Sequence, residues 1–429
     1  MKKVQYRHTL TFNPKQLFPE EEANRIIGFL LGNIIRADHI LIGIPCLPGA
    51  IIASPSIPED PGTDQNYVYD WTRDSAIVMA EIVHLYKTTR NACFRDIVHN
   101  YISFTESVQN HGNVALGYAR WNLDASPSEN WSVQNDGPAL RAIVLLEALD
   151  ALDSSMQQRA LQCIAKDVDY TLRVYDQDTK NIWEEECGSH FFAKIVMRKL
   201  LIAAAASQHL PQIMAAAIAA PKKHLEDHLD RHWVASEAYY KSQLDAPTAK
   251  GNDVNAAVIL GLLYGGTDDD SDYDIASAKG MRTLSKILRV FDPYFPINAE
   301  DAKFGLGPNL GRYPLDFYDG DISDPEADFG HPWFICTNAA ACAFYRIAAR
   351  AAKDPAAARE ADAAFAHLAG PSGKADCAAL GDRMVLTTKR HWDCGRMTEQ
   401  YSRWTGMMNS VIDLSWSYAT YLMCRRLRP

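Results

Sequence analysis

The feature that most constrains the fold of this chain is a helical periodicity that returns along most of its length. Apolar residues recur at i, i+3, i+4 and i+7 in one segment after another, and the alternating runs typical of strands are few. The pattern predicts an all-α protein of about twelve helices. The expected helices cover roughly residues 20–41, 72–87, 92–109, 137–152, 156–175, 189–206, 208–229, 252–264, 276–291, 333–352, 354–369 and 409–427.

Long connections rich in Gly, Pro, Asp and Trp separate these helices. Connections of more than about 15 residues inside a compact domain are usually functional. We therefore expect them to converge at one end of a helical scaffold. No low-complexity linker divides the chain, which favours a single domain over residues 1–429. The long connections are 44–70, 111–136, 177–188, 294–332 and 386–408.

Composition narrows the class of ligand. The 429 residues are 47% hydrophobic and 22% charged, as in globular proteins. A net charge of −10 argues against nucleic acid or an anionic membrane as the main partner, so we expect a neutral ligand. No apolar stretch reaches the length of about 18 residues that a membrane span needs. We expect a monomer that is either cytoplasmic or secreted with its signal peptide already removed.

Motifs for metal, nucleotide and serine hydrolase chemistry are missing from the sequence. The nine cysteines include no CxxC pair, and the histidines include no HExxH. A phosphate loop of the GxxxxGK[ST] type and the GxSxG nucleophile motif are also absent. We therefore expect neither a metal nor a cofactor.

Two distant segments supply a candidate pair of carboxyl groups. Trp183 is followed by Glu184, Glu185 and Glu186, and far downstream Glu399 lies between Thr398 and Gln400. A glycosidase needs one carboxyl group that stays protonated and another that stays ionised. Repulsion among three adjacent glutamates beside an indole predicts a raised pKa for one of them. Taken alone, Glu399 is much more typical of a solvated loop residue.

Three further clusters combine aromatic and charged side chains next to expected helix starts. Aromatic faces stack on sugar rings, and Arg and Asp bind vicinal hydroxyl groups. Each cluster has a structural alternative: a helix cap with a local Arg–Asp pair, a turn with a helix start, or a surface salt bridge of little energy. The clusters are Tyr67, Trp71, Arg73 and Asp74; Trp131 with 135–138; and Arg312 and Asp316 with Trp333.

Taken together and in this order, these segments resemble glucoamylases of glycoside hydrolase family 15, especially the fungal and yeast catalytic domain. The resemblance runs from Ala53 to Ala419, which is most of the chain. It implies an (α/α)6 barrel of six outer and six inner helices, with the active site in a pocket built by the connecting loops. It also implies a single catalytic domain, and no starch-binding domain is recognisable, so granular starch is expected to be a poor substrate.

The resemblance also assigns roles to individual residues. Glu184 would be the general acid and Glu399 the general base of an inverting exo-α-glucosidase, with carboxyl groups roughly 6.5–9.5 Å apart. Such an enzyme releases β-glucose from α-1,4 links and, more slowly, from α-1,6 links. Glu185 would bind the sugar on the leaving side, and Arg312 would bridge the two sugars. The other expected substrate contacts are Tyr67, Trp71, Arg73, Asp74, Trp131, Ile182, Trp183, Trp333, Gln400 and Trp416.

The chain departs from the family pattern in two places, and other functions stay open. The segment 131–134 is one residue shorter than its family counterpart and lacks the arginine, so we expect altered outer subsites. Glu186 and Cys187 add a third negative charge, which predicts a higher pH optimum. Specialisation for isomalto-oligosaccharides or trehalose is one alternative, and a non-catalytic glucan-binding module is another. An unrelated helical lyase or cyclase would need an Asp-rich metal motif or a Tyr or His base at a matching position, and the acidic run Asp268–Asp270 is more typical of a solvated loop.

Overall fold

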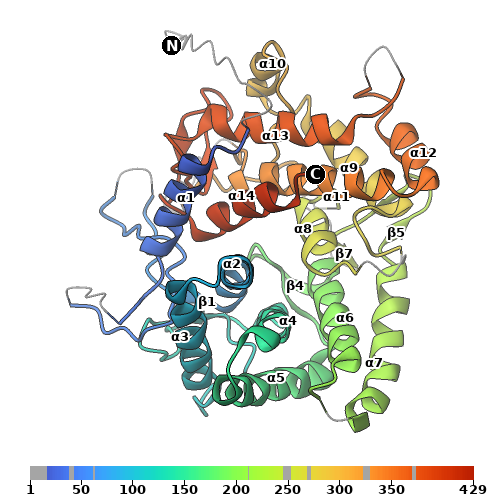
Figure 1. Ribbon diagram of the computed structural model, residues 1–429. Helices are drawn as coiled ribbons and strands as arrows, with labels where there is room; N and C mark the ends of the chain where they lie inside the picture. The colour runs from blue at the N-terminus through green and yellow to red at the C-terminus, as the bar shows by residue number, and fades with distance from the viewer. Residues whose placement is uncertain are drawn as a thin grey trace.

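The computed structural model shows a protein built almost entirely of helices, with strands of only two to four residues (Figure 1). None of the helices within the described part of the chain is both long and apolar enough to cross a membrane. The nine cysteines all lie in this part, and each is a free thiol. The structure describes residues 17–37, 43–60, 63–210, 212–244, 253–267, 272–321, 329–369 and 373–429.

Six helices form an inner ring. Each packs against the next in chain order, and the last packs against the first, which closes the ring (Figure 1). A helix that is covered on all sides needs apolar residues all round. Ala256–Leu263, for example, is buried without interruption. The inner helices are α2 (Thr72–Thr89), α4 (Asp136–Ala148), α6 (Phe191–Ala206), α8 (Ala256–Tyr264), α11 (Phe334–Ala351) and α14 (Ser415–Leu427).

Six outer helices alternate with the inner ones along the chain, and each packs on the outside of the ring. They are amphipathic: in 278–291, Met281, Leu284, Leu288 and Phe291 face the ring. The resulting double ring of paired helices confirms the expected (α/α)6 barrel. The outer helices are α1 (Glu20–Gly32), α3 (Ala92–Gln109), α5 (Ser154–Val174), α7 (Gln212–Asp230), α9 (Ala278–Phe291) and α13 (Cys377–His391).

The observed helices differ from the expected ones in a few places. The first ends at Gly32 instead of residue 41, and the last begins at Ser415 instead of residue 409. The short helix α10 (Pro296–Ala302) lies within an expected connection, and α12 (Pro355–Ala364) is shorter than the helix expected over 354–369. The prediction missed α13 and placed a loop over its second half, because that half buries polar residues such as Lys389, which pairs with Glu22 at 2.7 Å.

Short antiparallel strands fasten the connections that lead into the inner helices. Because β1 ends directly before α2 and β4 directly before α6, these pairings hold the backbone at the helix entrances. The pairs are β1 (Asp70–Trp71) with β2 (Arg120–Trp121), β5 (Trp233–Val234) with β6 (Tyr239–Tyr240), and β8 (Gln400–Tyr401) with β9 (Met408–Asn409). A three-stranded sheet joins β3 (Thr179–Lys180), β4 (Cys187–His190) and β7 (Gln243–Leu244).

Buried histidines lie where α7 ends beside β4. His190 is 4% exposed and His232 is fully buried, with its Nδ1 at 2.9 Å from the carbonyl oxygen of Lys241. Burial lowers the pKa of His190 to about 4 and that of His232 to about 3, from an ordinary value of 6.5. Both side chains are therefore neutral in the folded protein at neutral pH.

Because these two histidines are buried in the neutral form, we expect the protein to lose stability in mild acid. Their folded pKa values lie below the unfolded value, so the unfolded chain binds more protons between about pH 4 and 6.5. The free energy of unfolding should therefore fall as the pH is lowered through that window. Urea unfolding at several pH values measures this, and His232→Gln, whose amide can still donate to Lys241, should show a weaker dependence. An unchanged dependence in the variant would contradict the assignment.

Candidate active site

A pocket of about 400 Å³ lies where the N-terminal ends of the inner helices meet. The connections that carry the sequence motifs end here, so residues far apart in the sequence share one cavity. Helix N-termini also present unpaired N–H groups and a positive dipole, which favour carboxylates nearby. The lining residues are Ala53, Gln65, Tyr67, Trp71, Arg73, Asp74, Trp131, Ile182, Trp183, Glu184, Glu185, Arg312, Tyr318, Trp333, Glu399, Leu414 and Trp416.

Paired aromatic rings form the pocket walls. Trp71 lies 5.5 Å from Tyr67 and meets Trp131 edge-on at 5.8 Å, measured between ring centres. Trp183 and Trp333 form a second edge-on pair at 5.5 Å. Such contacts fix the rings in place, and their exposed faces suit the apolar face of a sugar ring.

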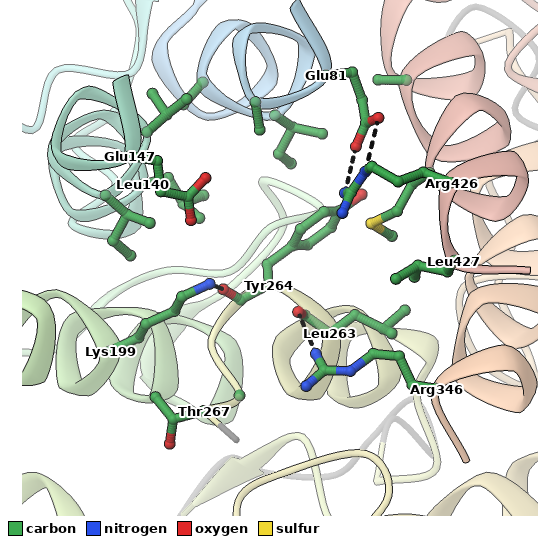
Figure 2. Close-up of a pocket in the computed structure, with 18 residues that line it drawn as sticks. Glu81, Leu140, Glu147, Lys199, Leu263, Tyr264, Thr267, Arg346, Arg426 and Leu427 are labelled. Carbon is green, nitrogen blue, oxygen red and sulfur yellow. Dashed lines mark hydrogen bonds and ion pairs between the residues drawn. The ribbon is translucent and has the colours of Figure 1, made fainter. Parts of the chain in front are cut away.

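One aromatic pair separates this pocket from a second cavity on the other side. Trp416 lines the pocket, and its Nε1 donates a hydrogen bond to the Tyr264 hydroxyl at 3.1 Å. Tyr264 in turn lines a cavity of about 500 Å³ inside the inner ring (Figure 2). There, both carboxylate oxygens of Glu81 accept from Arg426, so this carboxylate is paired. The hydrogen-bonded Trp416–Tyr264 pair thus joins the linings of the two cavities.

Several hydrogen-bond donors surround one carboxylate oxygen of Glu184. Oε1 accepts from Trp71 Nε1 at 2.9 Å and from Gln134 Nε2 at 2.7 Å. Trp131 Nε1 lies 3.4 Å and Arg73 Nη2 3.8 Å from the same oxygen. The carboxyl group is thus oriented by side chains from two other connections, while 23% of the side chain stays exposed.

The backbone at Glu184 is strained and held by its neighbours. Its φ of 64° lies in the left-handed region, which non-glycine residues rarely adopt. The Asn181 side-chain oxygen accepts from the amides of Trp183 and Glu185, and Lys180 Nζ donates to the Glu184 carbonyl at 3.0 Å. Strain of this kind persists where the surroundings enforce it, and it is common at functional sites.

Glu399 is buried inside a cage of hydroxyl donors. Its side chain accepts from Tyr67 at 3.0 Å on Oε1, and from Tyr318 at 3.0 Å and Ser410 at 2.7 Å on Oε2. Burial raises the pKa of Glu399, and these hydrogen bonds oppose the rise. With only 2% of the residue exposed, it is not an ordinary solvated loop glutamate.

Gln400 differs from its expected role as a substrate contact. It is fully buried and is not among the residues that line the pocket. Its Nε2 lies 3.3 Å from Oε2 of Glu399, behind that carboxylate. The reason is the short β8–β9 ladder, in which the register pairs Gln400 with Asn409.

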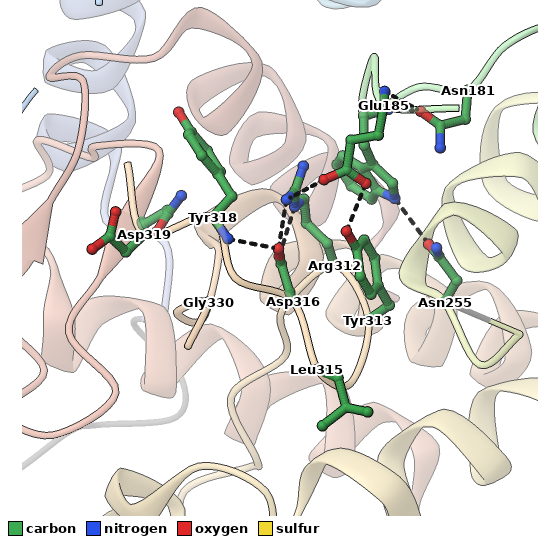
Figure 3. Close-up of polar contacts among 12 residues, drawn as sticks. Asn181, Glu185, Asn255, Arg312, Tyr313, Leu315, Asp316, Tyr318, Asp319 and Gly330 are labelled. Carbon is green, nitrogen blue, oxygen red and sulfur yellow. Dashed lines mark hydrogen bonds and ion pairs between the residues drawn. The ribbon is translucent and has the colours of Figure 1, made fainter. Parts of the chain in front are cut away.

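Arg312 links two carboxylates at the pocket wall (Figure 3). It donates to both oxygens of Asp316 at 2.6 and 2.7 Å and to Glu185 at 3.0 Å. Tyr313 donates to the other oxygen of Glu185 at 2.6 Å. Because Arg312 and Asp316 are each 3% exposed, the alternative of a surface salt bridge is wrong.

The same contacts correct the idea of three glutamates crowding one another. The carboxylate of Glu185 points to Arg312, whose positive charge offsets it, and that of Glu184 lies among Trp71 and Gln134. Neighbours in sequence therefore point to different partners. The environment of Glu184 is set by the walls of the pocket and not by the adjacent charges.

Arg73 and Asp74 occupy the first turn of α2. Arg73 is 4% exposed, and it pairs with Asp136 at 3.0 Å and more loosely with Asp74 at 3.6 Å. The local Arg–Asp pair considered as an alternative is therefore present, inside the pocket wall. Burial raises the pKa of Asp74 to about 7, although Arg73 opposes the rise and Glu184 adds to it.

Several residues at the site were not identified from the sequence. Tyr318 and Ser410 bond the Glu399 carboxylate, and Gln134 bonds Glu184. None of them belongs to a local pattern that marks a catalytic group. Within the described residues, no group of three or more His, Cys, Asp or Glu side chains is placed to hold a metal ion. The acidic run Asp268–Asp270 lies outside those residues.

The Ser410 hydroxyl predicts a measurable shift in pH dependence. It lowers the pKa of Glu399, so Ser410→Ala should raise that pKa further and delay ionisation to higher pH. If activity requires ionised Glu399, the acidic limb of the profile of kcat against pH should move upward. Tyr318→Phe should act in the same direction, since its hydroxyl makes the same kind of bond. Profiles of both variants that superimpose on that of the wild type would contradict this.

Comparisons with known proteins point to one family. Residues 30–426 match the family model described as "Glycosyl hydrolases family 15". Glucoamylase 1 from Rhizopus oryzae is 28% identical over 392 residues, which is 83% of this chain and 64% of that protein. A glucoamylase from Blastobotrys adeninivorans is 27% identical, over 89% of this chain and 67% of that protein. The chain thus spans about two thirds of the length of these relatives.

The fold agrees with solved structures. A glucoamylase from Saccharomycopsis fibuligera superimposes with a TM-score of 0.79 at 22% identity, covering 99% of this chain and 98% of that one. A glycoside hydrolase family 15 glucoamylase from Hypocrea jecorina also gives a TM-score of 0.79, over 95% of this chain and 71% of that one at 23% identity. These matches support the barrel assignment.

Proposed function

This chain belongs to glycosyl hydrolases family 15, and we propose that it is an inverting exo-α-glucosidase acting on α-1,4-linked glucans and malto-oligosaccharides. It would release β-D-glucose from non-reducing ends, with slower action on α-1,6 links. The observation that carries the proposal is the pair Glu184 and Glu399, which line one pocket in contrasting environments. Their roles are supported by the contacts of each carboxyl group.

Glu184 would act as the general acid. Its Oε1 accepts hydrogen bonds from Trp71 and Gln134, neither of which can take a proton from it. Oε2 accepts none of the bonds found among the described residues, so it is the oxygen we assign to carry the proton. Donation of that proton to the glycosidic oxygen would assist departure of the leaving sugar.

Glu399 would act as the general base. Tyr67, Tyr318 and Ser410 all donate to its carboxylate, which favours the ionised form despite its burial. An ionised carboxylate on the opposite side of the sugar ring can orient a water molecule and accept its proton. Attack by that water inverts the configuration at the anomeric carbon.

The scissile bond would lie between two groups of sugar-binding residues in the pocket. Arg73 and Asp74 lie in the first turn of α2 near Trp416, with Arg73 5.7 Å from the Trp416 ring centre. They would hold the terminal glucose. Glu185 and Arg312, on the other wall, would bind the next sugar through charge-assisted hydrogen bonds.

The Trp416–Tyr264 pair favours attack at chain ends. We infer that the Trp416–Tyr264 pair closes the base of the pocket, so that a polymer could not thread through it and only a chain terminus would reach Glu184. One glucose unit would then be released in each turnover.

The proposal is tested by following glucose release from maltotriose, with isomaltose and trehalose assayed in parallel. We expect the fastest release from maltotriose and a slower one from isomaltose. Release from trehalose alone would indicate a family member with another specificity. Absence of glucose from all three substrates would remove the enzymatic function and favour a glucan-binding module.

A further inference from the structure

Large aromatic side chains are exposed on the outer side of the loop that forms one wall of the pocket. Phe317 is 54% exposed and Phe329 is 37% exposed, and their rings stack at 5.8 Å with an angle of 24°. Trp404, in the turn between β8 and β9, is 59% exposed. We call these three residues the rim platform. Grouped exposed aromatic residues usually mark a binding surface.

A buried arginine connects the members of the platform. Arg403 is 6% exposed, and its guanidinium carbon lies 5.3 Å from the ring centre of Phe329 and 5.5 Å from that of Trp404. It also donates to the carbonyl oxygens of Gly330 and Tyr294 at 3.3 and 3.1 Å. The loop before α11 and the β8–β9 turn are thereby joined under one aromatic surface.

The platform adjoins the residues that we assign to sugar binding. Along the loop, Asp316 pairs with Arg312 and Tyr318 bonds Glu399, while Phe317 between them is exposed. Leu315 is also exposed, at 48%, and points away from the Arg312 pair in Figure 3. One loop therefore presents polar groups to the pocket and apolar groups to the outside.

Hydrogen bonds fix the backbone next to the platform residues. Leu315 has a φ of 63°, and its backbone N–H donates a hydrogen bond to the Tyr294 hydroxyl oxygen at 2.7 Å. In the β8–β9 turn, Ser402 and Met407 are joined by a backbone hydrogen bond of 2.7 Å. The Asn409 side chain donates to the carbonyl oxygen of Asp319 at 2.6 Å, which ties the turn to the loop. A preorganised surface loses little entropy on binding.

We propose that the rim platform binds outer glucose units of long α-glucan chains, through stacking of pyranose rings on Phe317, Phe329 and Trp404. The inference rests on the proposed function and extends it to polymeric substrates. A neutral polysaccharide suits aromatic faces on a protein of net charge −10. The area of three aromatic side chains is far below the about 800 Å² per partner that a stable protein interface buries. A protein partner therefore fits this surface less well than a glucan chain. The platform also offers contacts to sugar units outside the pocket, since none of its three residues is among those that line it.

The test compares substrates of different length. Trp404→Ala and Phe317→Ala should each raise KM for soluble amylose about 3- to 10-fold, which corresponds to the loss of one stacking contact. Values of kcat and KM for maltotriose should stay as in the wild type, because this short substrate fits inside the pocket. Both variants should also migrate faster than the wild type in native gels that contain glycogen.

A matched control is Phe304→Ala. Phe304 is 50% exposed but rests on Arg390 of α13, with 4.2 Å from the guanidinium carbon to the ring centre. This variant should behave as the wild type on both substrates. Circular dichroism and thermal unfolding establish that all three variants are folded.

Distinct results would overturn the proposal. An unchanged KM for amylose in both platform variants would remove the glucan site, as would equal losses on amylose and maltotriose. Self-association of the wild type that disappears in Trp404→Ala, with glycogen retardation unchanged, would assign the surface to a second copy of the chain. Failure of the proposed catalytic function is separable, because glycogen retardation is measured without turnover.

Discussion

Glu184→Gln is expected to lower kcat for maltotriose by about 10²- to 10⁴-fold, the usual contribution of general acid catalysis. The amide has the shape of the carboxyl group and can still accept from Trp71 and Gln134 through its oxygen. It cannot supply a proton to the glycosidic oxygen. Binding should be retained, so KM should change far less than kcat.

A substrate with a good leaving group distinguishes loss of the acid from general damage. α-Glucosyl fluoride needs little protonation to depart, so Glu184→Gln should retain much more activity on it than on maltotriose. The matched control is Glu186→Gln, which makes the same change two residues away at a half-buried side chain that does not line the pocket. It should leave kcat nearly unchanged. Equal losses on maltotriose and the fluoride in Glu184→Gln would contradict the assignment of the acid.

Glu399→Gln is expected to lower kcat by a similar factor of about 10² to 10⁴, but on both substrates. Activation of water is needed whatever the leaving group, so α-glucosyl fluoride should not spare this variant. The Tyr318 and Ser410 hydroxyl groups can donate to the amide oxygen in place of the carboxylate, so the fold should persist. Steady-state kinetics with the two substrates give the comparison.

Comparing Glu399→Gln with Glu184→Gln on the two substrates assigns the roles of acid and base. Selective survival of fluoride hydrolysis in the Glu399 variant would reverse the two roles. Activity near that of the wild type on maltotriose would show that another group activates the water. Thermal unfolding of the variant checks that a loss of activity is not a loss of structure.

The sequence predicted the architecture well because inner and outer helices carry strong local signals. The uninterrupted apolar run of α8 and the amphipathic pattern of α9 each identify a helix without tertiary information. The prediction missed helix α13 because the C-terminal half of this helix buries polar groups that bond to residues distant in the sequence. His391, for instance, lies 2.7 Å from Asp301. Polar residues buried by such long-range pairs interrupt the apolar periodicity by which a helix is predicted.

The candidate site was predictable only in part. The resemblance indicated Glu184, Glu399 and most of the pocket walls, and the structure places them around one cavity. Ser410 and Tyr318 act on Glu399 from 11 and 81 residues away in sequence, so no local pattern reveals them. Gln400 is the opposite case, because the sequence suggested a substrate contact and the structure does not place it in the pocket lining. The β8–β9 ladder holds its backbone so that the side chain is buried next to Glu399.

The most direct test of the account is the anomeric configuration of the first glucose released from maltotriose, followed by proton NMR before mutarotation. Water attack opposite to the leaving group, assisted by Glu399 with Glu184 as the acid, predicts that β-glucose appears first and that α-glucose follows only by equilibration. Initial release of α-glucose would contradict the inverting mechanism and require one of the two carboxylates to act as a nucleophile.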